Sequence, residues 1–477
     1  MPDLEGVPPI DKFEPLKTKY YSLVRGVLKL AVEGRRIIVV THLDADGITS
    51  GSIVFAALMR KGANVVLRCV PDLDHELISK LGEEKHDFYI FTDLASTLIG
   101  DLEAVVGGRF LVIDHHQLAD ADKDNPMVVN AWNFGLDGGK EASSASMAYF
   151  FATAVDPSNR DLSPLAVVGA VADRQDRGPD RSLNGLNGSA LQDAKTARLV
   201  STSRDLLFTG RETRPIHESV ALTSAPFLKG VTGNKEAVLA ALHQSGLRLK
   251  DGGAWRTISS LSNEEKMKVT EVVAGLTASA GDATESISEL VGDVYTLELE
   301  DPLTPLRDAR EFATLLNACG RMGRAGTGVS VCLGDRTESL SSAIATLTEY
   351  RGGIGRALKA LSDDATRTTK VGGLVVVHAE GLVEEKLLGP VISILTSSPG
   401  YSDKVVVGFA SSGDTELKVS SRVGDAHTGG VNLGLVMRGA AEAVNGVGGG
   451  HGMAAGAKIP SSQAEAFSKL VSGMLPS

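Results

Sequence analysis

The chain has 477 residues, of which 43% are hydrophobic and 22% are charged. This composition is typical of a globular protein of two or three domains and excludes a disordered chain. The net charge of -11 argues against a protein that coats nucleic acid indiscriminately. No apolar run approaches the ~18 residues of a membrane span, and the N-terminal segment lacks the apolar core of a signal peptide. We therefore expect a cytoplasmic protein without membrane contact.

The first region of the chain alternates predicted helices and strands. Apolar residues at helical spacing predict a helix over about residues 16–33. Short apolar segments predict strands at about 37–41, 64–70, 88–92 and 109–113. The segment SGSIVFAALMRKG predicts a crossover helix between the first two strands. This alternation predicts an α/β fold with a doubly wound parallel sheet.

The rest of the chain divides into a helical part and a second α/β region. After the turn-rich segment DRGPDRSLNGLNGS, the pattern is mostly helical from about 189 to 292 and carries no catalytic constellation. A second α/β region starts near residue 305 and is clearest from VGGLVVVHAEG onward. We expect domains at 1–188, 189–304 and 305–477, and a site in the cleft between the two α/β lobes.

Acidic and histidine side chains follow the predicted strands of the first region. Because the carboxyl ends of parallel strands meet at one edge of a sheet, these side chains are expected to gather there. Packed carboxylates would raise one another's pKa values unless cations neutralised them. Carboxylate mixed with imidazole suits manganese and similar ions better than calcium. The residues are His42, Asp44, Asp46, Asp93, Asp114, His115 and His116, with Asp173 in VVGAVADRQD completing the set.

Each of these motifs also has a purely structural interpretation. An isolated HLDADG segment is more often a solvated turn or a helix cap, and Asp93 alone would serve equally well to cap the next helix. Ser143 and Ser144 in EASSASMAYFF either line the substrate path or cap a helix. Consecutive histidines after a buried strand are harder to dismiss, because they bring no packing advantage.

The C-terminal region carries a predicted phosphate clamp. Its glycines would let backbone N–H groups approach a phosphate, and Arg422 in the SSR segment that begins at Ser420 would supply a bidentate fork. Arg321 and Arg324 would extend the groove, or else form a solvated basic face at a helix C-terminus. The clamp residues that follow SSR in the chain are Gly448, Gly449, Gly450 and His451.

Six segments resemble the successive motifs of the DHH phosphoesterase superfamily. They are HLDADG, TD at Asp93, DHH at 114–116, VGAVADRQD, SSR and GVGGGHGMAAG. The resemblance implies a DHH domain at 1–188, a helical connector or insertion at 189–304 and a smaller α/β DHH-associated domain at 305–477. It also implies two divalent ions, with Mn²⁺ favoured and Mg²⁺ as the other candidate.

The resemblance implies a role for each site residue. His42, Asp44 and Asp93 would hold the first ion, and Asp93 would bridge to a second ion. Asp114 would orient His115, and His116 would lie near the scissile phosphate as a catalytic group. The remaining ligands of the second ion would be Asp46, His115 and Asp173.

Within the superfamily, LLNACGRMGR and GRETRP are similar to segments of archaeal RecJ-like exonucleases, a branch that includes GINS-associated nucleases. This similarity implies a single-strand-specific exonuclease of replication or repair, with 5′ to 3′ action on DNA favoured. An RNA exonuclease and a phosphoesterase of oligonucleotides or small nucleotides are alternatives. A scaffold that binds GINS and the replicative helicase, with secondary catalysis, is a third.

Overall fold

In the computed structural model, the described residues are 12–118, 122–178, 180–224, 226–280, 285–398, 400–424, 427–450 and 452–475. The chain divides into two compact units. The first comprises 1–213 and 291–347, and the second comprises 214–290 and 348–477. Within the described residues, the helices do not combine the length and apolar character that crossing a bilayer requires.

The first unit is built on a parallel sheet with the strand order β2-β1-β3-β4-β5. The order changes direction between β1 and β3, as in other doubly wound folds. The strands are β1 (Arg36–His42), β2 (Asn64–Val70), β3 (Phe88–Thr92), β4 (Phe110–Asp114) and β5 (Val128–Asn130). The predicted parallel sheet is thus confirmed, and β1 to β4 have boundaries within about two residues of those expected, whereas β5 was not predicted.

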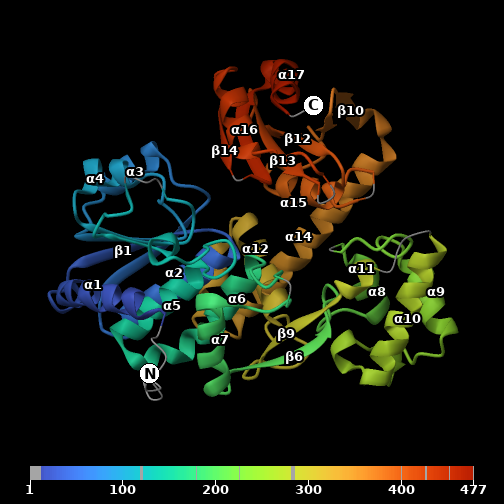
Figure 1. Cartoon of the computed structure of the whole chain (residues 1–477), viewed down its shortest axis with the longest axis horizontal. Helices are drawn as coiled ribbons and strands as arrows, with labels where there is room; N and C mark the ends of the chain where they lie inside the picture. The colour runs from blue at the N-terminus through green and yellow to red at the C-terminus, as the bar shows by residue number, and fades with distance from the viewer. Residues whose placement is uncertain are drawn as a thin grey trace, which may run out of the picture. The chain divides into compact units, whose positions relative to one another are not determined.

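Helices cover both faces of this sheet, which is why β3 and β4 are buried along their whole length. Figure 1 shows α3 and α4 over one face and α1, α2 and α5 over the other. Apolar side chains of α3 and α4 pack on Tyr89, Phe91 and Phe110 of the sheet. The helices are α1 (Glu14–Val32), α2 (Ala45–Met59), α3 (His75–Glu83), α4 (Ile99–Val106) and α5 (Ser144–Val155).

The first unit also contains further helices and an antiparallel ribbon. They are α6 (Ser163–Ala172), α7 (Gly185–Thr196), α12 (Ala309–Arg321) and α13 (Ala325–Cys332), with β6 (Val200–Leu206) paired to β9 (Val291–Leu297). The sequence prediction missed β6, because its segment VSTSRDL lacks the apolar alternation of a half-buried strand. The strand is stabilised by antiparallel pairing with β9, which lies about 90 residues further along the chain and is not visible in the local sequence.

Helix α12 packs tightly against the loop that follows β1. The side-chain Oδ1 of Asn317 accepts a hydrogen bond from the backbone N–H of Ala45 at 3.0 Å. A Cβ atom on Gly320 would lie 1.7 Å from the carbonyl oxygen of Leu43, so only glycine fits at this contact. The segment LLNACGRMGR therefore supports the HLDADG loop directly.

The second unit contains a mixed sheet with the order β10-β11-β12-β13-β15-β14, in which only β11 and β12 pair in parallel. The strands are β10 (Thr368–Val371), β11 (Leu374–His378), β12 (Val405–Ser412), β13 (Glu416–Val423), β14 (Val447–Gly450) and β15 (Ala454–Pro460). The accompanying helices are α15 (Glu385–Thr396), α16 (Leu433–Glu442) and α17 (Ala464–Met474). Apolar residues of β11 to β13, α16 and α17 form its core.

The helical part of the second unit lies between β6 and β9 in the chain. It consists of α8 (Ile216–Leu222), α9 (Lys235–Gln244), α10 (Asn263–Ser279) and α11 (Glu285–Ser288), with a short hairpin of β7 (Lys250–Asp251) and β8 (Ala254–Trp255). Helix α14 (Glu338–Asp363) begins in the first unit and ends in the second. The α/β pattern that we expected from residue 305 therefore begins with helices, and its first strand is β10. The predicted domain boundaries themselves remain predictions.

We predict that Gly320→Ala destabilises the protein by about 1–3 kcal/mol or more, because the added methyl group forces α12 away from Leu43. Urea unfolding would measure the loss. Gly326→Ala in α13 is the matched control: its Cβ meets nothing within 4 Å, and we expect it to be neutral or to stabilise by up to about 1 kcal/mol. Equal stability of both variants would contradict the proposed packing of α12.

Candidate metal centre

The acidic and histidine residues singled out from the sequence gather at the carboxyl edge of the parallel sheet. This edge, at the change of strand order between β1 and β3, is where doubly wound folds bind ligands. Each side chain is placed by the end of a regular element: His42 by β1, Asp44 and Asp46 by the N-terminus of α2, Asp93 by β3, Asp114 to His116 by β4, and Asp173 by the C-terminus of α6.

The first group of potential ligands is His42, Asp44 and Asp93. The Nδ1 atom of His42 lies 2.9 Å from Asp44 Oδ2 and 3.6 Å from Asp93 Oδ2. The other oxygen of Asp44 accepts the N–H of Gly47 at 3.0 Å and so caps α2. Burial lowers the pKa of His42, but Asp44 and Asp93 outweigh burial and hold that pKa well above its usual value.

The second group is Asp46, His115 and Asp173. The Nε2 atom of His115 lies 3.3 Å from Asp173 Oδ2, 3.4 Å from Asp93 Oδ1 and 3.9 Å from Asp46 Oδ2. This nitrogen is buried and has no hydrogen-bond partner within the described residues. Ligands at right angles around a six-coordinate ion are about 3 Å apart when each is about 2.1 Å from it. The spacing therefore fits a metal ion placed between these atoms.

Asp93 belongs to both sets of contacts. Its Oδ2 faces His42 and its Oδ1 faces His115, so one carboxylate spans the two groups. The residue is 3% exposed and has a backbone φ of +61°. A non-glycine residue in this left-handed region costs of order 1–3 kcal/mol, and such residues cluster at functional sites. The strained backbone turns the carboxylate towards both histidines.

Asp46 is fully buried at the N-terminus of α5. Its two oxygens accept the backbone N–H groups of Ser144 at 2.7 Å and Ala145 at 3.0 Å. The helix dipole favours a negative charge here. Burial nevertheless raises the pKa of Asp46, and the carboxylates of Asp173 and Asp93 raise it further. This carboxylate is therefore held rigidly but is short of positive charge.

Asp173 shares this shortage of positive charge. Burial raises the pKa of its carboxyl to about 7, with Asp44 and Asp93 adding to the shift and His115 opposing it. A carboxyl group with so high a pKa is about half protonated at neutral pH unless a cation replaces the proton. The donor set of aspartate oxygens and imidazole nitrogens, the unpaired Nε2 of His115 and these raised pKa values all fit divalent ions.

Asp114 orients His116 and not, as we had expected, His115. Its Oδ1 lies 2.8 Å from His116 Nδ1, and its Oδ2 accepts the hydroxyl of Ser96 at 2.6 Å. His115 Nδ1 instead lies 2.5 Å from the carbonyl oxygen of Gly138. Burial lowers the pKa of His116, but Asp114 and Asp93 outweigh it and raise that pKa to about 9.

Ser143 caps the N-terminus of α5, which is one of the two roles that the sequence allowed. The Ser143 side chain accepts the N–H of Ser146, and the Ser146 hydroxyl lies 3.1 Å from the Ser143 N–H, which completes a capping box. Ser144 contributes its backbone N–H to Asp46, as described above. The two serines thus support Asp46, a residue of the candidate centre, through the start of α5.

Of the two basic residues Arg321, at the end of α12, and Arg324, the N-cap of α13, Arg321 lies close to the candidate centre. Its charge helps to hold the pKa of Asp44 below the usual range, against burial and after the larger effect of His42. Arg324 instead donates to the hydroxyl of Thr346 in α14 at 2.9 Å. A groove role for both residues stays a prediction.

The predicted phosphate clamp lies in the second unit. Arg422 donates to Ser393 Oγ at 3.0 Å and to the carbonyl oxygen of Ser421 at 2.7 Å, and its contact with Ser420 Oγ is 3.4 Å. Gly448 is required by packing, because a Cβ there would lie 2.5 Å from the Met437 carbonyl oxygen. Gly450, with φ of +136°, is required by its contact with Ala455.

The remaining clamp residues have different surroundings. A Cβ on Gly449 would meet nothing within 4 Å, so this residue alone among the three glycines has open space beside it. His451 lies outside the described residues. The clamp therefore remains a prediction.

Sequence reasoning missed the residues that support the ligands from behind. Gly138 contacts His115, Asn317 binds the loop after β1, and Ser96 binds Asp114. Asn130 donates to Ser96 Oγ and to the His116 carbonyl oxygen, both at 2.9 Å. Each is a single small or amide residue in a turn, a helix or the end of a strand, and only Asn317 lies in a segment, LLNACGRMGR, that the sequence analysis singled out.

Three known domain families match the sequence in order. They are the DHH family N-terminal domain over residues 36–170, the DHH-CID domain over 207–291 and the DHHA1 domain over 372–475. A relative in Methanocaldococcus jannaschii, itself uncharacterized, is 28% identical over 442 residues, which is 91% of each chain.

Solved structures of similar fold cover almost the whole chain. CDC45 from Entamoeba histolytica has a TM-score of 0.67 at 13% identity and covers 96% of this chain and 98% of its own. RecJ from Thermus thermophilus in complex with Mn²⁺ has a TM-score of 0.58 at 17% identity. It covers 98% of this chain, which spans only 55% of that protein's length. An exonuclease RecJ bound to manganese has a TM-score of 0.55 at 18% identity, and the match covers 97% of this chain and 95% of the RecJ chain.

The chain therefore carries three domains of the DHH family, namely the DHH N-terminal domain, the DHH-CID domain and the DHHA1 domain. Its fold is RecJ-like, with a parallel sheet in the DHH domain and a mixed sheet in the DHHA1 domain. The resemblance to this family and the α/β fold class expected from the sequence are both confirmed.

We predict that Mn²⁺ raises the thermal unfolding temperature of the protein and that Asp93→Asn removes most of this increase. The substitution keeps the shape of the side chain but removes the charge that spans both ligand groups. At a metal concentration of about 100 Kd, binding adds about 2.7 kcal/mol of stability. Differential scanning calorimetry with and without Mn²⁺ would measure the shift.

Asp403→Asn is the control for this measurement, because Asp403 is an exposed carboxylate of the second unit paired with Lys404. We expect it to keep the whole metal-dependent increase. An unchanged increase in Asp93→Asn would contradict a metal centre built around Asp93.

Proposed function

We propose that this protein is a metal-dependent phosphodiesterase of RecJ type that removes nucleotides from single-stranded ends, with 5′ to 3′ action on DNA favoured. We also propose that the protein binds two divalent ions as cofactors, with Mn²⁺ favoured over Mg²⁺. RecJ from Thermus thermophilus has been solved with each of these ions. The observation that carries the proposal is the carboxylate of Asp93, which lies between two groups of ligands that each contain a histidine.

Charge balance supports two ions over one. Asp44, Asp46, Asp93 and Asp173 bring four negative charges to the centre when ionised. Two divalent cations neutralise them while both histidines remain neutral ligands. With both histidines neutral, a single divalent ion would leave two negative charges uncompensated in a site where Asp46 and Asp93 are almost fully buried.

The assignment of ligands follows the two groups. We propose His42, Asp44 and Asp93 for one ion, and Asp46, Asp93, His115 and Asp173 for the other. When bound, such ions lower the pKa of coordinated water and bind the oxygens of the attacked phosphate. Asp46 is locked by the start of α5, and His115 by Gly138, so the protein holds these ligands at fixed positions.

His116 is proposed to act on the substrate. Asp114 holds its Nδ1 at 2.8 Å and is itself fixed by Ser96, so the imidazole has a defined orientation beside the ligands. An oriented imidazole can donate a proton to the leaving group or stabilise charge on the phosphate. Arg321, whose charge reaches Asp44, is proposed to bind a neighbouring phosphate, with Arg324 continuing along the strand.

The proposed substrate is a single-stranded nucleic acid. We propose that Arg422, Ser420, Gly448, Gly449, Gly450 and His451 of the DHHA1 domain bind its phosphates. Of these, Gly449 has the open space that close approach of a backbone to a phosphate requires. RNA, or a short oligonucleotide or small nucleotide, would use the same metal chemistry and is distinguished only by experiment.

A role in a replication complex is a second candidate, favoured by the similarity in fold to CDC45. In this role GINS and the replicative helicase would be the partners, in the cytoplasm. A scaffold without catalysis would have no need for a buried cluster of aspartates, which is costly to fold. The intact ligand set therefore favours an enzyme, with scaffolding as an additional role.

The proposal is tested by digestion of single-stranded DNA and RNA, labelled at either end and offered in a series of lengths from dinucleotides upward. Reactions with Mn²⁺, with Mg²⁺ and with chelator are compared. We expect metal-dependent shortening of DNA with loss of the 5′ label first, and no activity in Asp93→Asn. Cleavage of dinucleotides alone would replace the exonuclease with a small-substrate phosphoesterase, and no cleavage of any substrate would contradict the enzyme.

We predict that His116→Gln lowers kcat by about 10²–10⁴-fold, because the oriented imidazole is lost, and leaves the affinity for Mn²⁺ unchanged. Titration calorimetry and initial-rate kinetics would measure the two quantities. His75→Gln is a suitable control, since His75 is an exposed histidine of α3 paired with Asp101. Loss of Mn²⁺ affinity in His116→Gln would instead make this residue a metal ligand, as its closeness to Asp93, Asp114 and His115 also permits.

A further inference from the structure

A continuous chain of hydrogen bonds runs behind the second ligand group. The backbone N–H of Ser143 donates to Asn187 Oδ1 at 3.0 Å, and Asn187 Nδ2 donates to Gln175 Oε1 at 2.6 Å. Gln175 Nε2 then donates to the carbonyl oxygens of Gly138 at 2.9 Å and Ala142 at 3.1 Å. Every link lies in the first unit.

The direction of each hydrogen bond in this chain is determined. The N–H of Ser143 can only donate, so Asn187 presents its oxygen there and its NH₂ group to Gln175. Gln175 must accept with its oxygen and therefore presents its NH₂ group to the two carbonyl oxygens. Neither amide can flip without placing like groups against each other, which is costly for buried groups.

These hydrogen bonds also determine which ring nitrogen of His115 carries a hydrogen. The carbonyl oxygen of Gly138 can only accept, so His115 Nδ1 at 2.5 Å carries a hydrogen. A neutral His115 with Nδ1 protonated presents a lone pair on Nε2, the atom that faces Asp46, Asp93 and Asp173. The position of the Gly138 carbonyl group, which Gln175 holds, thus selects the tautomer that binds metal.

The series of hydrogen bonds that runs from Ser143 to Gly138 ends, on each side, directly behind a proposed metal ligand. At one end, Ser143 is the N-cap of α5, the helix whose first N–H groups bind Asp46. At the other end, the Gly138 carbonyl group fixes His115. Gln175 itself follows Asp173, the third member of the group, by two residues.

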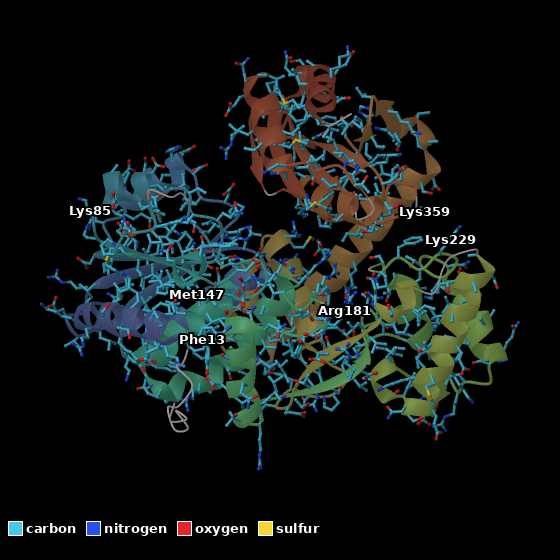
Figure 2. The ribbon with its side chains drawn as sticks, viewed as in Figure 1. Phe13, Lys85, Met147, Arg181, Lys229 and Lys359 are labelled. Atoms are coloured by element: carbon cyan, nitrogen blue, oxygen red, sulfur yellow. The ribbon has the colours of Figure 1, made fainter. Side chains whose placement is uncertain are left out.

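The amides are buried and the segment that bears them is anchored. Gln175 is 5% exposed and Asn187 is 1% exposed. Between them, Asp176 forms an ion pair with Arg310 of α12, and the Arg181 carbonyl oxygen accepts the N–H of Asp293 in β9. Arg181 is labelled in Figure 2, in the first unit together with Met147 of the buried helix α5.

A Cβ at Gly138 would lie 1.9 Å from the His115 carbonyl oxygen, so the turn that presents the Gly138 carbonyl group has no room for adjustment. The Gly138 carbonyl group therefore has a fixed position between Gln175 and His115.

We propose that Gln175 and Asn187 are positioning residues that hold Asp46, His115 and Asp173 in the geometry for one of the two ions. This inference rests on the proposed function, because it assigns these amides to the second ligand group of the same centre. Within the described residues, His42 and Asp44 have no hydrogen bond to Gln175 or Asn187 and are joined to the second group through the shared Asp93, so we expect the larger effect on one ion.

The test is titration of Mn²⁺ alone into the full-length protein by calorimetry, with electron paramagnetic resonance of the same samples. We expect wild type to bind two ions and to give the multiline spectrum of a spin-coupled pair. Gln175→Met should weaken one binding event by about 10–100-fold and give the six-line spectrum of a single ion at intermediate Mn²⁺. Asn187→Leu, which acts one hydrogen bond further away, should show a smaller change of the same kind.

Gln192→Met is the matched control, because Gln192 is an exposed glutamine on α7, the helix that carries Asn187. We expect both binding events to be as in wild type. Circular dichroism shows whether each variant is folded, and Asn187→Leu serves if Gln175→Met is not. Two unchanged binding events in the folded variants, or equal weakening of both, would overturn the inference alone. Absence of Mn²⁺ binding in wild type would overturn the metal centre together with it.

Discussion

The structure depends on one electrostatic constraint: several carboxylates lie close together where little water reaches them. Asp46 and Asp93 are almost fully buried, and the pKa values of Asp46 and Asp173 are raised by burial and by their acidic neighbours. Folding would not bring such groups together without compensation, because an unpaired buried charge is very costly. The helix N-terminus at Asp46 and the two histidines offset part of this cost, and we propose that divalent ions offset the remainder.

The rest of the first unit can be understood as the means of meeting this constraint. Parallel strands deliver His42, Asp93 and Asp114 to one edge, because their carboxyl ends share that edge. The first N–H groups of helix α5 donate hydrogen bonds to Asp46. Helix α12 packs against the loop that carries Asp44, and Gly320 allows this close approach. The strained backbone of Asp93 is consistent with a site whose geometry is imposed by its surroundings.

Much of this arrangement could be predicted from sequence, for identifiable reasons. The strands of the parallel sheet are short apolar runs, and each ligand follows a strand or lies at a helix end, so local pattern and topology together locate the site. Pattern could not reveal β6, which is polar and pairs with a distant strand. Nor could the pattern reveal that Asp114 contacts Nδ1 of His116 while the Gly138 carbonyl group contacts Nδ1 of His115. These contacts depend on which turn lies beside which imidazole in the folded protein. The amides of Gln175 and Asn187 escaped notice because a single buried amide has no sequence signature.

The central claim is that Asp93 joins two ion sites, and anomalous diffraction from crystals grown with Mn²⁺ tests it most directly. The account predicts two anomalous peaks about 3.5–4 Å apart. One should lie within reach of His42, Asp44 and Asp93, and the other within reach of Asp46, Asp93, His115 and Asp173. A single peak, or two peaks of which Asp93 contacts only one, would contradict it.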